Sequence, residues 1–417
     1  MIKETLVLLK NIRQAGYKGT IEEYQQTGGY SVWKKVLKDL TPDDVKKQVK
    51  DSGLRGRGGA GFPTGFKWGF MADVKGKPNY LVCNADEGEP GTFKDRELMI
   101  KDPHLFLEGM LISCFAVKCN TGYIYVRGEY YEAIKILKRE IAQLNKAKFL
   151  GDNILGSGYS LKLVVHSGAG AYICGEETAL LDSLEGKRGL PRVKPPFPAV
   201  SGFNACPTSV NNVETLANVP FIMEKGAEAF KANGTINNAG TRLISVSGLV
   251  KRPGVYEIKM GVNLKDIIYD FGGGTLPNRT LKAVIPGGSS SPVLLADEID
   301  IGCDFDCLQK AKSMLGSAGV VVLDDTVDMP RLLHRLIEFY AHESCGQCTP
   351  CREGLNWIRI LLRDLLARRL EKSWVDQIYR IAGNITGTTL CALGDAGAIP
   401  VMSFIDKFRE EFLGYCK

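Results

Sequence analysis

The chain has 417 residues, of which 44% are hydrophobic and 24% are charged. These fractions exclude a disordered or fibrous chain, and the length allows about three domains. The formal net charge of +6 is too small for a dedicated nucleic-acid binder, whose surface is dominated by basic residues. No apolar run is long enough to span a bilayer, so we expect a cytoplasmic protein whose link to any membrane runs through a partner.

The positive charge is concentrated at the start of the chain. Residues 1–70 contain 13 basic and 7 acidic side chains, so the rest of the chain is neutral overall. Apolar residues at helical spacing predict short helices over residues 1–50, one of them capped by Thr41. We interpret the basic segment as a solvated helix face, with a docking surface for an acidic partner as the alternative.

Strand-like and helix-like segments alternate in the next part of the chain, which predicts a largely parallel sheet. The expected order is a strand at 79–83, a helix at 98–117, a strand at 122–126, a helix at 131–144 and a strand at 161–165. Frequent proline and glycine then predict a long ordered loop over 186–212, and loops of that length are usually functional.

Two further patterns complete the chain. A predicted hairpin, a helix and a triple-glycine turn within residues 242–325 suit a small β-grasp module. Apolar residues at helical spacing then predict a C-terminal bundle of four helices, at 331–340, 355–370, 374–381 and 399–412. The sequence shows no internal repeat and no low-complexity tract.

The cysteines of the C-terminal region form a distinct motif. Cys345, Cys348 and Cys351 follow a C-x2-C-x2-C spacing, and Cys391 lies 40 residues further on. Three thiolates close in sequence with a distant fourth are typical of a [4Fe–4S] cluster. Zinc is an alternative, although zinc sites usually use two separated C-x2-C pairs, and unligated core cysteines are a third reading. Buried thiols are expected at the other cysteines, which are Cys83, Cys114, Cys119, Cys174, Cys206, Cys303, Cys307 and Cys416.

A glycine-dense segment precedes the first predicted strand, with seven glycines in residues 53–69. Residues 56–61 satisfy G-x-G-x-x-G, but no buried strand precedes them and Pro63 follows at once, so this is not the Rossmann dinucleotide fingerprint. The loop still suits a phosphate, because its backbone can present N–H groups while Arg57 and Lys67 add positive charge. A flexible surface loop is the alternative. Stacking on adenine or flavin is suggested by four nearby aromatic residues, Phe62, Phe66, Trp68 and Phe70.

An acidic turn follows the first predicted strand, at residues 84–91. Ligands of open α/β sheets bind at the carboxyl ends of strands, which is where this turn falls. Carboxylates such as Asp86 and Glu89 can accept hydrogen bonds from ribose hydroxyls and would repel a 2′-phosphate, which favours NADH over NADPH. A solvated, capped turn is the alternative.

Two later segments carry further polar residues. A second glycine turn at 168–175 leads into a predicted helix, where Glu176 and Glu177 either cap the helix N-terminus or face a nicotinamide. Two amides and a hydroxyl follow at Asn211, Asn212 and Thr215. They can form hydrogen bonds with the edge of a flavin, or they simply mark the start of a helix. We find no Ser/His/Asp arrangement, and hydride transfer between two rings needs alignment more than a side-chain acid or base.

Taken together, these motifs resemble those of the NADH-binding flavoprotein subunit of respiratory complex I, the NADH:quinone oxidoreductase. The similarity runs over nearly the whole chain and rests on four motifs in one order, at residues 56–65, 84–92, 174–179 and 343–352. It implies hydride transfer from NADH to non-covalent FMN, then single electrons to a [4Fe–4S] cluster and onward towards quinone. It also implies an α/β fold with a Rossmann-like FMN and NADH domain, a ubiquitin-like β-grasp domain and a cluster-bearing helical bundle.

The resemblance also implies domain limits and partners. The implied parts are N-terminal helices with the glycine loop at 1–75, an FMN- and NADH-binding α/β domain at 76–240, the ubiquitin-like domain at 241–328 and the cluster-bearing bundle at 329–417. The implied partners are NADH, a small [2Fe–2S] thioredoxin-like subunit and other peripheral-arm subunits, with no nucleic acid and no direct membrane insertion. The implied location is cytoplasmic and peripheral to the inner membrane through the complex.

The resemblance assigns roles residue by residue. The residues implied to hold FMN are Gly56, Arg57, Gly58, Lys67, Asn84, Asp86, Asn211, Asn212 and Thr215. Those implied to bind NADH are Phe62, Phe70 and Phe197 around the adenine, Glu89 at the adenosine ribose, and Lys67. Those implied to lie near the nicotinamide and to act in hydride transfer are Tyr172, Glu176 and Glu177. The implied cluster ligands are Cys345, Cys348, Cys351 and Cys391.

Three other readings stay open. Diaphorase subunits of NAD-linked hydrogenases and formate dehydrogenases share the same core but often carry an N-terminal thioredoxin-like domain or C-terminal ferredoxin-like cysteines. This sequence has neither, which favours the complex I reading. A zinc-stabilised nucleotide-binding module without redox chemistry is a remote alternative. A phosphotransferase is weaker still, because the G-x-x-x-x-G-K-[ST] motif is absent.

Overall fold

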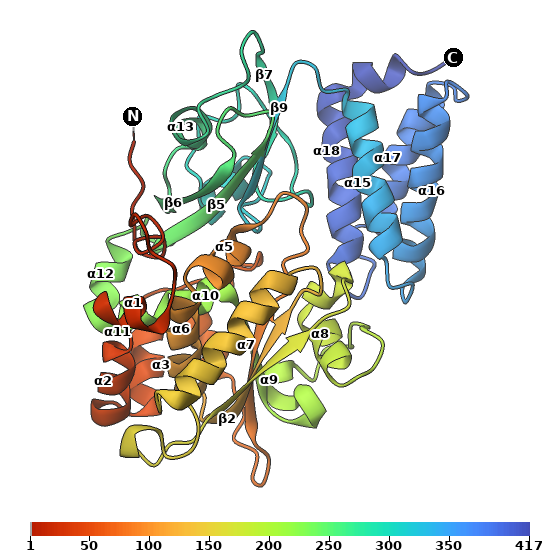
Figure 1. Cartoon of the computed structure of the whole chain (residues 1–417). Helices are drawn as coiled ribbons and strands as arrows, with labels where there is room; N and C mark the ends of the chain where they lie inside the picture. Colours follow the sequence, from red (N-terminus) through yellow and green to blue (C-terminus); the bar gives the residue numbers. More distant parts are fainter. Residues whose placement is uncertain (1) are drawn as a thin grey trace.

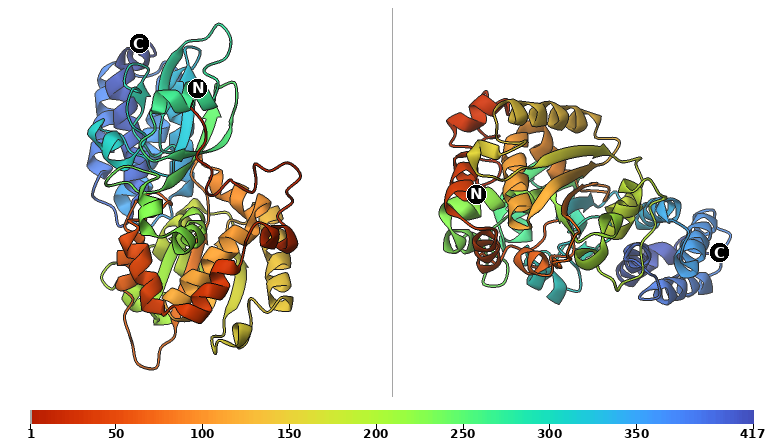
Figure 2. Two further views of the ribbon diagram at one scale, coloured as in Figure 1. Left: turned by 90° about the vertical axis from the view of Figure 1, so that its left-hand side faces the viewer. Right: turned by 90° about the horizontal axis from the view of Figure 1, so that it is seen from below.

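The computed structural model describes residues 2–417 and consists of two sheets with their helices and a helical bundle (Figure 1). The first sheet and its covering helices form the lower part of Figure 1, the second sheet lies above it, and the bundle stands beside the second sheet. Seen from below in Figure 2, the N-terminal helices and the bundle lie at opposite ends. The predicted α/β fold with a β-grasp module and a C-terminal bundle is confirmed.

Four helices precede the first sheet, namely α1 (Ile21–Gln26), α2 (Ser31–Asp39), α3 (Pro42–Asp51) and α4 (Thr64–Gly69). Thr41 caps α3 as predicted, because its side chain accepts a hydrogen bond from the Asp44 N–H. Residues 2–20 contain no helix, so the prediction of short helices throughout 1–50 is wrong for that part. This segment is held instead by the buried carboxylate of Glu257, which accepts hydrogen bonds from three of its backbone N–H groups.

The first sheet has four parallel strands in the order β3-β2-β1-β4. Its strands are β1 (Asn79–Ala85), β2 (Cys119–Val126), β3 (Lys162–Ser167) and β4 (Thr208–Asn212). The first three match predicted strands, whereas β4 lies inside the segment 186–212 that we expected to be a loop. Its sequence, Thr-Ser-Val-Asn-Asn, is mostly polar, and it becomes a strand because it pairs with β1, a tertiary contact that local sequence does not show.

The strand order places a switch point between β1 and β4. From β1 the chain winds to β2 and β3 on one side, and it then returns to β4 on the other side of β1. In open α/β sheets, ligands bind in the crevice at such a point, outside the carboxyl ends of the strands. Asn84, Asn211 and Asn212 lie at this edge, because each falls at or next to the last residue of its strand.

Helices cover this sheet and follow it in the chain. They are α5 (Lys94–Lys101), α6 (Pro103–Ala116), α7 (Tyr131–Lys146), α8 (Glu177–Leu184), α9 (Pro198–Ser201), α10 (Val213–Ala217), α11 (Val219–Lys225) and α12 (Ala227–Lys231), with 3-10 turns at Ile154–Gly156, Tyr172–Gly175 and Phe203–Ala205. The single helix predicted at 98–117 is divided into α5 and α6. The break occurs because Asp102 caps α6 by accepting a hydrogen bond from the Leu105 N–H, and Pro103 begins the new helix.

The second sheet has the strand order β6-β5-β9-β7-β8. Its elements are β5 (Thr241–Gly248), β6 (Gly254–Lys259), α13 (Leu264–Asp266), a π-helical turn (Ile267–Phe271), β7 (Leu281–Ile285), β8 (Leu294–Leu295), α14 (Phe305–Lys310) and β9 (Gly319–Asp324). The antiparallel pair β5–β6 is the predicted hairpin, and β9 returns parallel to β5. This combination of hairpin, helix and returning strand is the predicted β-grasp arrangement.

The C-terminal bundle consists of α15 (Met329–Glu343), α16 (Thr349–Leu366), α17 (Ser373–Ile385) and α18 (Leu393–Leu413), which confirms the four predicted helices. One apolar core joins Val82 and Tyr125 of the first sheet to Leu333 and Leu355 of the bundle. This shared core fixes the bundle against the α/β part, so groups on the two can lie close together. Within residues 2–417, no helix combines the length and the apolar character that crossing a bilayer requires.

Candidate functional site

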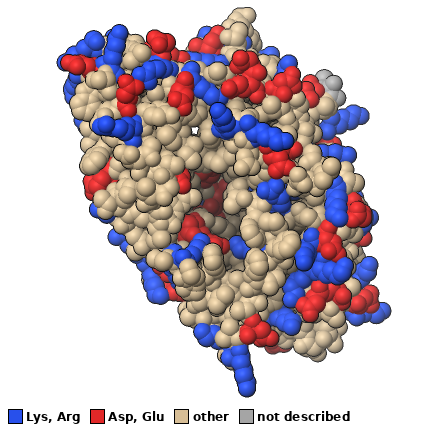
Figure 3. Space-filling model, turned by 180° about the vertical axis from the view of Figure 1, so that it is seen from behind, with Lys and Arg blue, Asp and Glu red and all other residues tan. Residues whose placement is uncertain are grey.

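Two cavities meet at the carboxyl ends of β1 and β4. We call the larger one, of about 830 Å³, the aromatic cavity, because it is lined by Phe62, Phe70 and Phe197. The smaller one, of about 530 Å³, is the acidic cavity, lined by Asp86 and Glu89 among others. Seven residues line both cavities, which therefore adjoin: Gly58, Gly59, Ala60, Asn84, Gly175, Glu176 and Asn212. Figure 3 shows a deep hollow on the face opposite that of Figure 1, with acidic side chains inside it.

Most of the predicted site residues line these cavities. The aromatic cavity contacts Gly56, Gly58, Lys67, Asn84, Asn211, Asn212, Thr215, Glu176 and Glu177, together with the three phenylalanines. The acidic cavity contacts Arg57, Gly58, Asn84, Asp86, Asn212, Glu89, Tyr172, Glu176 and Cys391. Glu89 therefore does not share a cavity with the phenylalanines that the resemblance places around the same nucleotide. Of the four predicted metal ligands, only Cys391 lines either of these two cavities.

The glycine loop is held close to the end of β4. A Cβ atom added to Gly58 would lie 3.2 Å from the Cβ of Asn212, which is tighter than ordinary packing. Gly61 has a φ of +65°, and a Cβ there would meet the ring of Phe305 at 2.6 Å. The backbone N–H of Arg57 donates to the Thr215 hydroxyl over 2.8 Å. The loop therefore presents backbone rather than side chains to the cavities.

The side chain of Arg57 is buried away from water. Its Nη2 donates to the carbonyl of Ala239 over 2.7 Å, while Nε and Nη1 have no hydrogen-bond partner among residues 2–417. Burial, together with repulsion from Arg242, lowers the pKa of Arg57 to about 9. The guanidinium thus retains unused donors, which suits a site that receives an anion.

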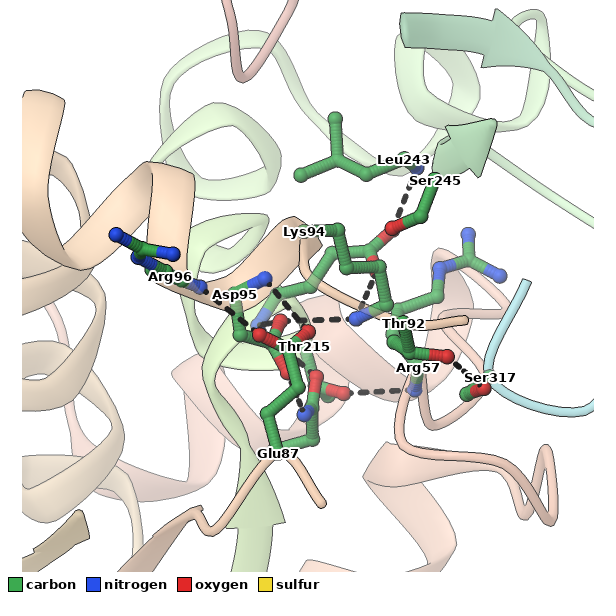
Figure 4. A network of polar contacts seen from close by, with 12 residues as sticks. Arg57, Glu87, Thr92, Lys94, Asp95, Arg96, Thr215, Leu243, Ser245 and Ser317 are labelled. Carbon is green, nitrogen blue, oxygen red and sulfur yellow. Dashed lines mark hydrogen bonds and ion pairs between the residues drawn. The ribbon is translucent and has the colours of Figure 1, made fainter. Parts of the chain in front are cut away.

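A buried polar network fixes the residues beside the glycine loop (Figure 4). Lys94 Nζ lies 2.8 Å from Asp95 Oδ1 and 2.6 Å from Glu214 Oε2, and all three side chains are almost completely buried. Glu87 accepts hydrogen bonds from the backbone N–H groups of Asp95 and Arg96 at the start of α5. Burial and the neighbouring Asp95 raise the pKa of Glu87 to about 7.

The network also ties the first sheet to the second. The N–H of Leu243 on β5 donates to Glu214 over 2.9 Å, and Thr92 is hydrogen-bonded to Ser317, next to β9. Leu243 and Ser245 approach from the side of β5 in Figure 4, and Ser317 approaches beside Arg57. The β-grasp part therefore forms one wall of the acidic cavity.

The three asparagines at the strand ends are oriented by the protein itself. Asn84 Nδ2 donates to the carbonyl of Gly175 over 2.8 Å, and Asn212 Nδ2 donates to Asp95 over 2.6 Å. Asn211 Oδ1 accepts a hydrogen bond from Trp68 Nε1 over 3.0 Å. Because each amide has a fixed partner, its remaining donors or acceptors keep one direction, which is what recognition of a ring edge requires.

Glu176 and Glu177 differ in what they contact. Glu176 caps α8, because its carboxylate accepts hydrogen bonds from the N–H groups of Thr178 and Ala179, which confirms the structural reading of this residue. Glu177 forms ion pairs with Lys67 at 3.0 Å and with Lys194 at 2.8 Å. Burial favours a higher pKa for Glu177, but the two lysines outweigh it and lower the pKa to about 2. The carboxylate is therefore ionised at any working pH.

The acidic cavity contains a carboxylate with spare hydrogen-bonding capacity. Asp86 Oδ2 is buried and has no partner among the described residues. Burial raises the pKa of Asp86 to about 7, against the opposing effect of Arg127. Glu89, in contrast, accepts hydrogen bonds from the Tyr172 hydroxyl over 2.6 Å and from the Ser290 N–H over 2.8 Å. Of these two carboxylates, Asp86 is thus the one with an oxygen that has no hydrogen-bond donor among the described residues.

The three phenylalanines of the aromatic cavity are largely exposed, at 50% for Phe62, 60% for Phe70 and 57% for Phe197. The rings of Phe62 and Phe70 lie 6.3 Å apart, at a tilt of 45°. Exposed aromatic rings at the mouth of a cavity are costly in water unless a ligand covers them. They offer faces on which a planar ring can stack.

Of the four predicted cluster ligands, Cys345 and Cys348 lie in the loop before α16, Cys351 lies in the first turn of α16, and Cys391 lies in the loop before α18. The Leu390 N–H donates to Cys348 Sγ over 3.3 Å, which brings the loop of Cys391 to the C-x2-C-x2-C loop. Burial, aided by the nearby Cys345, raises the pKa of Cys391 to about 11 despite a hydrogen bond from the backbone. Across residues 2–417, no three Cys, His, Asp or Glu side chains lie close enough to share a single metal ion.

The other cysteines follow the prediction in most cases. The buried ones are Cys83, Cys114, Cys119, Cys174, Cys206 and Cys303. Cys307 and Cys416 are half-exposed, so the prediction of buried thiols is wrong for these two. Cys307 lies in the short helix α14 and Cys416 lies beyond α18, where little of the chain covers them.

Comparisons with known proteins identify the family. The description "Nuo51 FMN-binding domain" matches residues 49–221, "SLBB domain" matches 242–322, and "NADH-ubiquinone oxidoreductase-F iron-sulfur binding region" matches 331–415. The NADH-quinone oxidoreductase F-subunit 2 of Rhizobium meliloti (strain 1021) is 50% identical over 409 residues, which cover 98% of this chain and 97% of that protein. The chain belongs to the F-subunit family of NADH-quinone oxidoreductases. The F-subunit of Streptomyces coelicolor is likewise 50% identical, over 94% of this chain and 87% of that protein.

A solved structure has a fold similar to that of this F-subunit family member. The crystal structure of an NAD⁺-reducing [NiFe]-hydrogenase in the H2-reduced state matches with a TM-score of 0.85 and 35% identity. The match covers 93% of this chain but 65% of the hydrogenase chain, so this chain spans about two thirds of that length. The predicted family and the predicted cofactors, FMN and a [4Fe–4S] cluster, are confirmed.

The residues of the F-subunit site fit both FMN and a [4Fe–4S] cluster. For FMN, the glycine loop, Arg57 and Asp86 line cavities within the size range of about 300–1,000 Å³ that small molecules use, and the side chains of both Arg57 and Asp86 have polar atoms without a hydrogen-bond partner among residues 2–417. For the cluster, the segment that carries Cys391 adjoins the loop of Cys345 and Cys348, and Cys351 follows in the first turn of α16, so four thiols of the kind that hold iron–sulfur clusters come from neighbouring segments. Both donor sets therefore agree with the chemistry of the groups.

Some residues of the site are not evident from the sequence. Lys194 pairs with both Glu176 and Glu177 and lines the aromatic cavity. Its place in a proline-rich loop that we expected to be functional was a usable signal. Ser290 and Ser317 of the β-grasp part line the acidic cavity, and no local pattern indicates this, because it depends on how the two sheets pack.

Proposed function

We propose that this chain is the NADH-oxidising subunit of an NADH:quinone oxidoreductase. It takes a hydride from NADH onto FMN and passes single electrons to a [4Fe–4S] cluster and onward towards quinone. The observation that carries the proposal is that Cys391, from the bundle, lines the cavity that adjoins the nucleotide-sized aromatic cavity. FMN supplies the chemistry that joins the two, because it accepts an electron pair and releases electrons singly.

We assign the binding of both nucleotides to the two adjoining cavities. The glycine loop and the asparagines at the ends of β1 and β4 hold FMN, with Asp86 and Thr215 beside them. Phe62, Phe70 and Phe197 offer the stacking surface for adenine. In domain terms, FMN and NADH occupy 76–240 with the glycine loop of 1–75, and the cluster occupies 329–417, beside the ubiquitin-like part at 241–328.

Three residues align the nicotinamide in this proposal. Glu177, held ionised between Lys67 and Lys194, presents a fixed negative charge to the aromatic cavity. Glu176 keeps the start of α8 in place through its capping bonds. Tyr172 and Glu89 are joined by a hydrogen bond in the acidic cavity, where Glu89 is available to a ribose. These side chains orient the ring and exclude water, and none of them transfers a proton to it.

The cluster ligands in this proposal are Cys345, Cys348, Cys351 and Cys391. Their support is the C-x2-C-x2-C motif and the contact that brings the segment of Cys391 to Cys348. Cys351 is buried, and the other three are partly buried.

The deciding experiment is the absorption spectrum of the purified chain before and after NADH under anaerobic conditions. We expect a yellow-brown protein whose flavin band bleaches with NADH and not with NADPH. A colourless protein that contains zinc would refute the proposal and support the nucleotide-binding module. The EPR spectrum of the reduced protein adds an independent check on the cluster.

We also propose that the chain works within the peripheral arm of complex I. Its neighbours there are a small [2Fe–2S] thioredoxin-like subunit and other peripheral-arm subunits, and its position is cytoplasmic and peripheral to the inner membrane. The subunit names of the relatives support this assignment. Purification of the native complex tests it, since a [2Fe–2S] protein must elute with the chain.

A second candidate is the diaphorase subunit of an NAD-linked hydrogenase. The observation in its favour is the TM-score of 0.85 with the hydrogenase structure. Hydrogen-dependent reduction of NAD⁺ by the native complex would support this candidate, and NADH-dependent reduction of quinone supports the first.

A further inference from the structure

Three of the four proposed cluster cysteines take part in hydrogen bonds with identifiable partners, and for Cys391 the donor is the backbone of Leu393. The Leu390 N–H donates to Cys348 Sγ over 3.3 Å, and the hydroxyl of Ser344 lies 3.2 Å from Cys351 Sγ. Ser344 directly follows α15, and Cys351 lies in the first turn of α16. The bond from Ser344 is made by a side chain, so it can be removed without altering the backbone.

The direction of the Ser344 bond follows from the second contact of its hydroxyl. The Gly346 N–H donates to Ser344 Oγ over 3.4 Å, which uses a lone pair of the hydroxyl and leaves its proton free. An iron-bound thiolate carries no proton and acts only as an acceptor. Ser344 therefore donates to the sulfur of Cys351.

We propose that Ser344 raises the reduction potential of the [4Fe–4S] cluster through its hydrogen bond to Cys351, an inference that rests on the proposed function. Reduction adds one electron, and hence one negative charge, to the cluster and its thiolates. A donor directed at sulfur stabilises that charge, and hydrogen bonds to the sulfurs are one of the features that set cluster potentials. Cys351 is only 6% exposed, so little water competes with the hydroxyl.

Ser344 acts through a ligand and touches no reacting atom, so it is a positioning residue. Its effect falls on the cluster alone, since it lines neither the aromatic nor the acidic cavity. The bleaching of the flavin by NADH is therefore expected to stay at the unsubstituted rate when Ser344 changes. This separates the effect from damage to the nucleotide site.

The test is a redox titration of the full chain with its native cofactors, followed by the EPR signal of the reduced cluster, with iron content measured in every sample. In Ser344→Ala we expect the equilibrium constant for one-electron reduction to fall about tenfold, which is a shift of about 59 mV to more negative potential. Ser344→Thr keeps the hydroxyl and restores the potential. Thr349→Val is the matched control, because the hydroxyl of Thr349, the first residue of α16, accepts a hydrogen bond from Arg352 and contacts no sulfur.

Each other outcome has a fixed meaning. An unchanged potential in Ser344→Ala with full iron content overturns the proposal. Should Ser344→Ala and Ser344→Val both lose the cluster while Ser344→Thr keeps it, the proposal is also overturned, because Ser344 then serves cluster assembly. Absence of any cluster signal in the unsubstituted chain refutes the proposed function itself, which keeps the two failures distinct.

Discussion

Replacement of Lys94 tests whether the buried polar network holds the site together. The Lys94 side chain is 1% exposed, and its ammonium lies within 2.8 Å of the carboxylates of both Asp95 and Glu214. Lys94→Met keeps most of the side-chain volume but removes the charge, which leaves two buried carboxylates without their cation. Breaking a buried ion pair from one side costs about 3–5 kcal/mol of the free energy of unfolding.

Differential scanning calorimetry of the full chain measures this cost. A domain as long as the FMN-binding match at 49–221 loses about 2–4 °C in Tm for each kcal/mol, so Lys94→Met is expected to lower its Tm by about 6–20 °C. The affinity for FMN is expected to fall as well, because Asp95 orients Asn212 at the cavity.

The matched control lies in the same helix. Lys101 forms a surface ion pair with Glu97 at 2.5 Å, with 53% of its side chain exposed, and such pairs contribute about 0.3–0.5 kcal/mol. Lys101→Met is therefore expected to change the Tm by no more than about 2 °C. Adding Glu214→Gln to Lys94→Met removes one orphaned carboxylate and recovers part of the loss. A Tm for Lys94→Met as high as that of Lys101→Met would refute the reasoning.

Three further predictions concern the cofactors. Asp86 has a pKa of about 7, so it is neutral well below that pH and negative well above it. A negative charge beside the flavin opposes its reduction. We therefore expect Asp86→Asn to raise the flavin potential at about pH 8.5 and to leave it unchanged at about pH 5.5. An equal shift of the potential at both pH values would contradict this. Glu177→Gln removes a permanently ionised group, and we expect a higher flavin potential with a kcat/KM for NADH about tenfold lower, which anaerobic titration and steady-state kinetics measure. If neither quantity changes, Glu177 has no part in aligning the nicotinamide. Cys391→Ser is expected to keep bleaching of the flavin by NADH while the cluster EPR signal disappears, and a full iron content with a normal signal would show that Cys391 is not a ligand.

Features that depend on local pattern were predictable from the sequence. The hairpin β5–β6, the cap at Thr41 and the four bundle helices follow from turn residues, capping residues and helical spacing. The glycine loop and the C-x2-C-x2-C motif point to their chemistry because the spacing itself is the constraint.

Features that depend on packing were not predictable in this way. Strand β4 is polar and short, and only its pairing with β1 makes it a strand. The ion pair between Lys94 and Glu214 joins segments far apart in the chain, and neither residue stands out in its own surroundings. Ser317 reaches the acidic cavity because the β-grasp part packs against the first sheet. Each of these depends on partners that arrive from elsewhere in the fold.

The position of Cys391 beside Asp86 and Tyr172 has a consequence for assembly. On the proposed function, the site where NADH delivers electrons and the first cluster that receives them belong to the same folded chain. The first electron transfer then needs no other subunit, and faults elsewhere in the assembly slow only the later electron transfers. An orphan copy of the chain would go on drawing electrons from NADH with dioxygen as their only outlet, so a cell gains by degrading whatever it fails to incorporate.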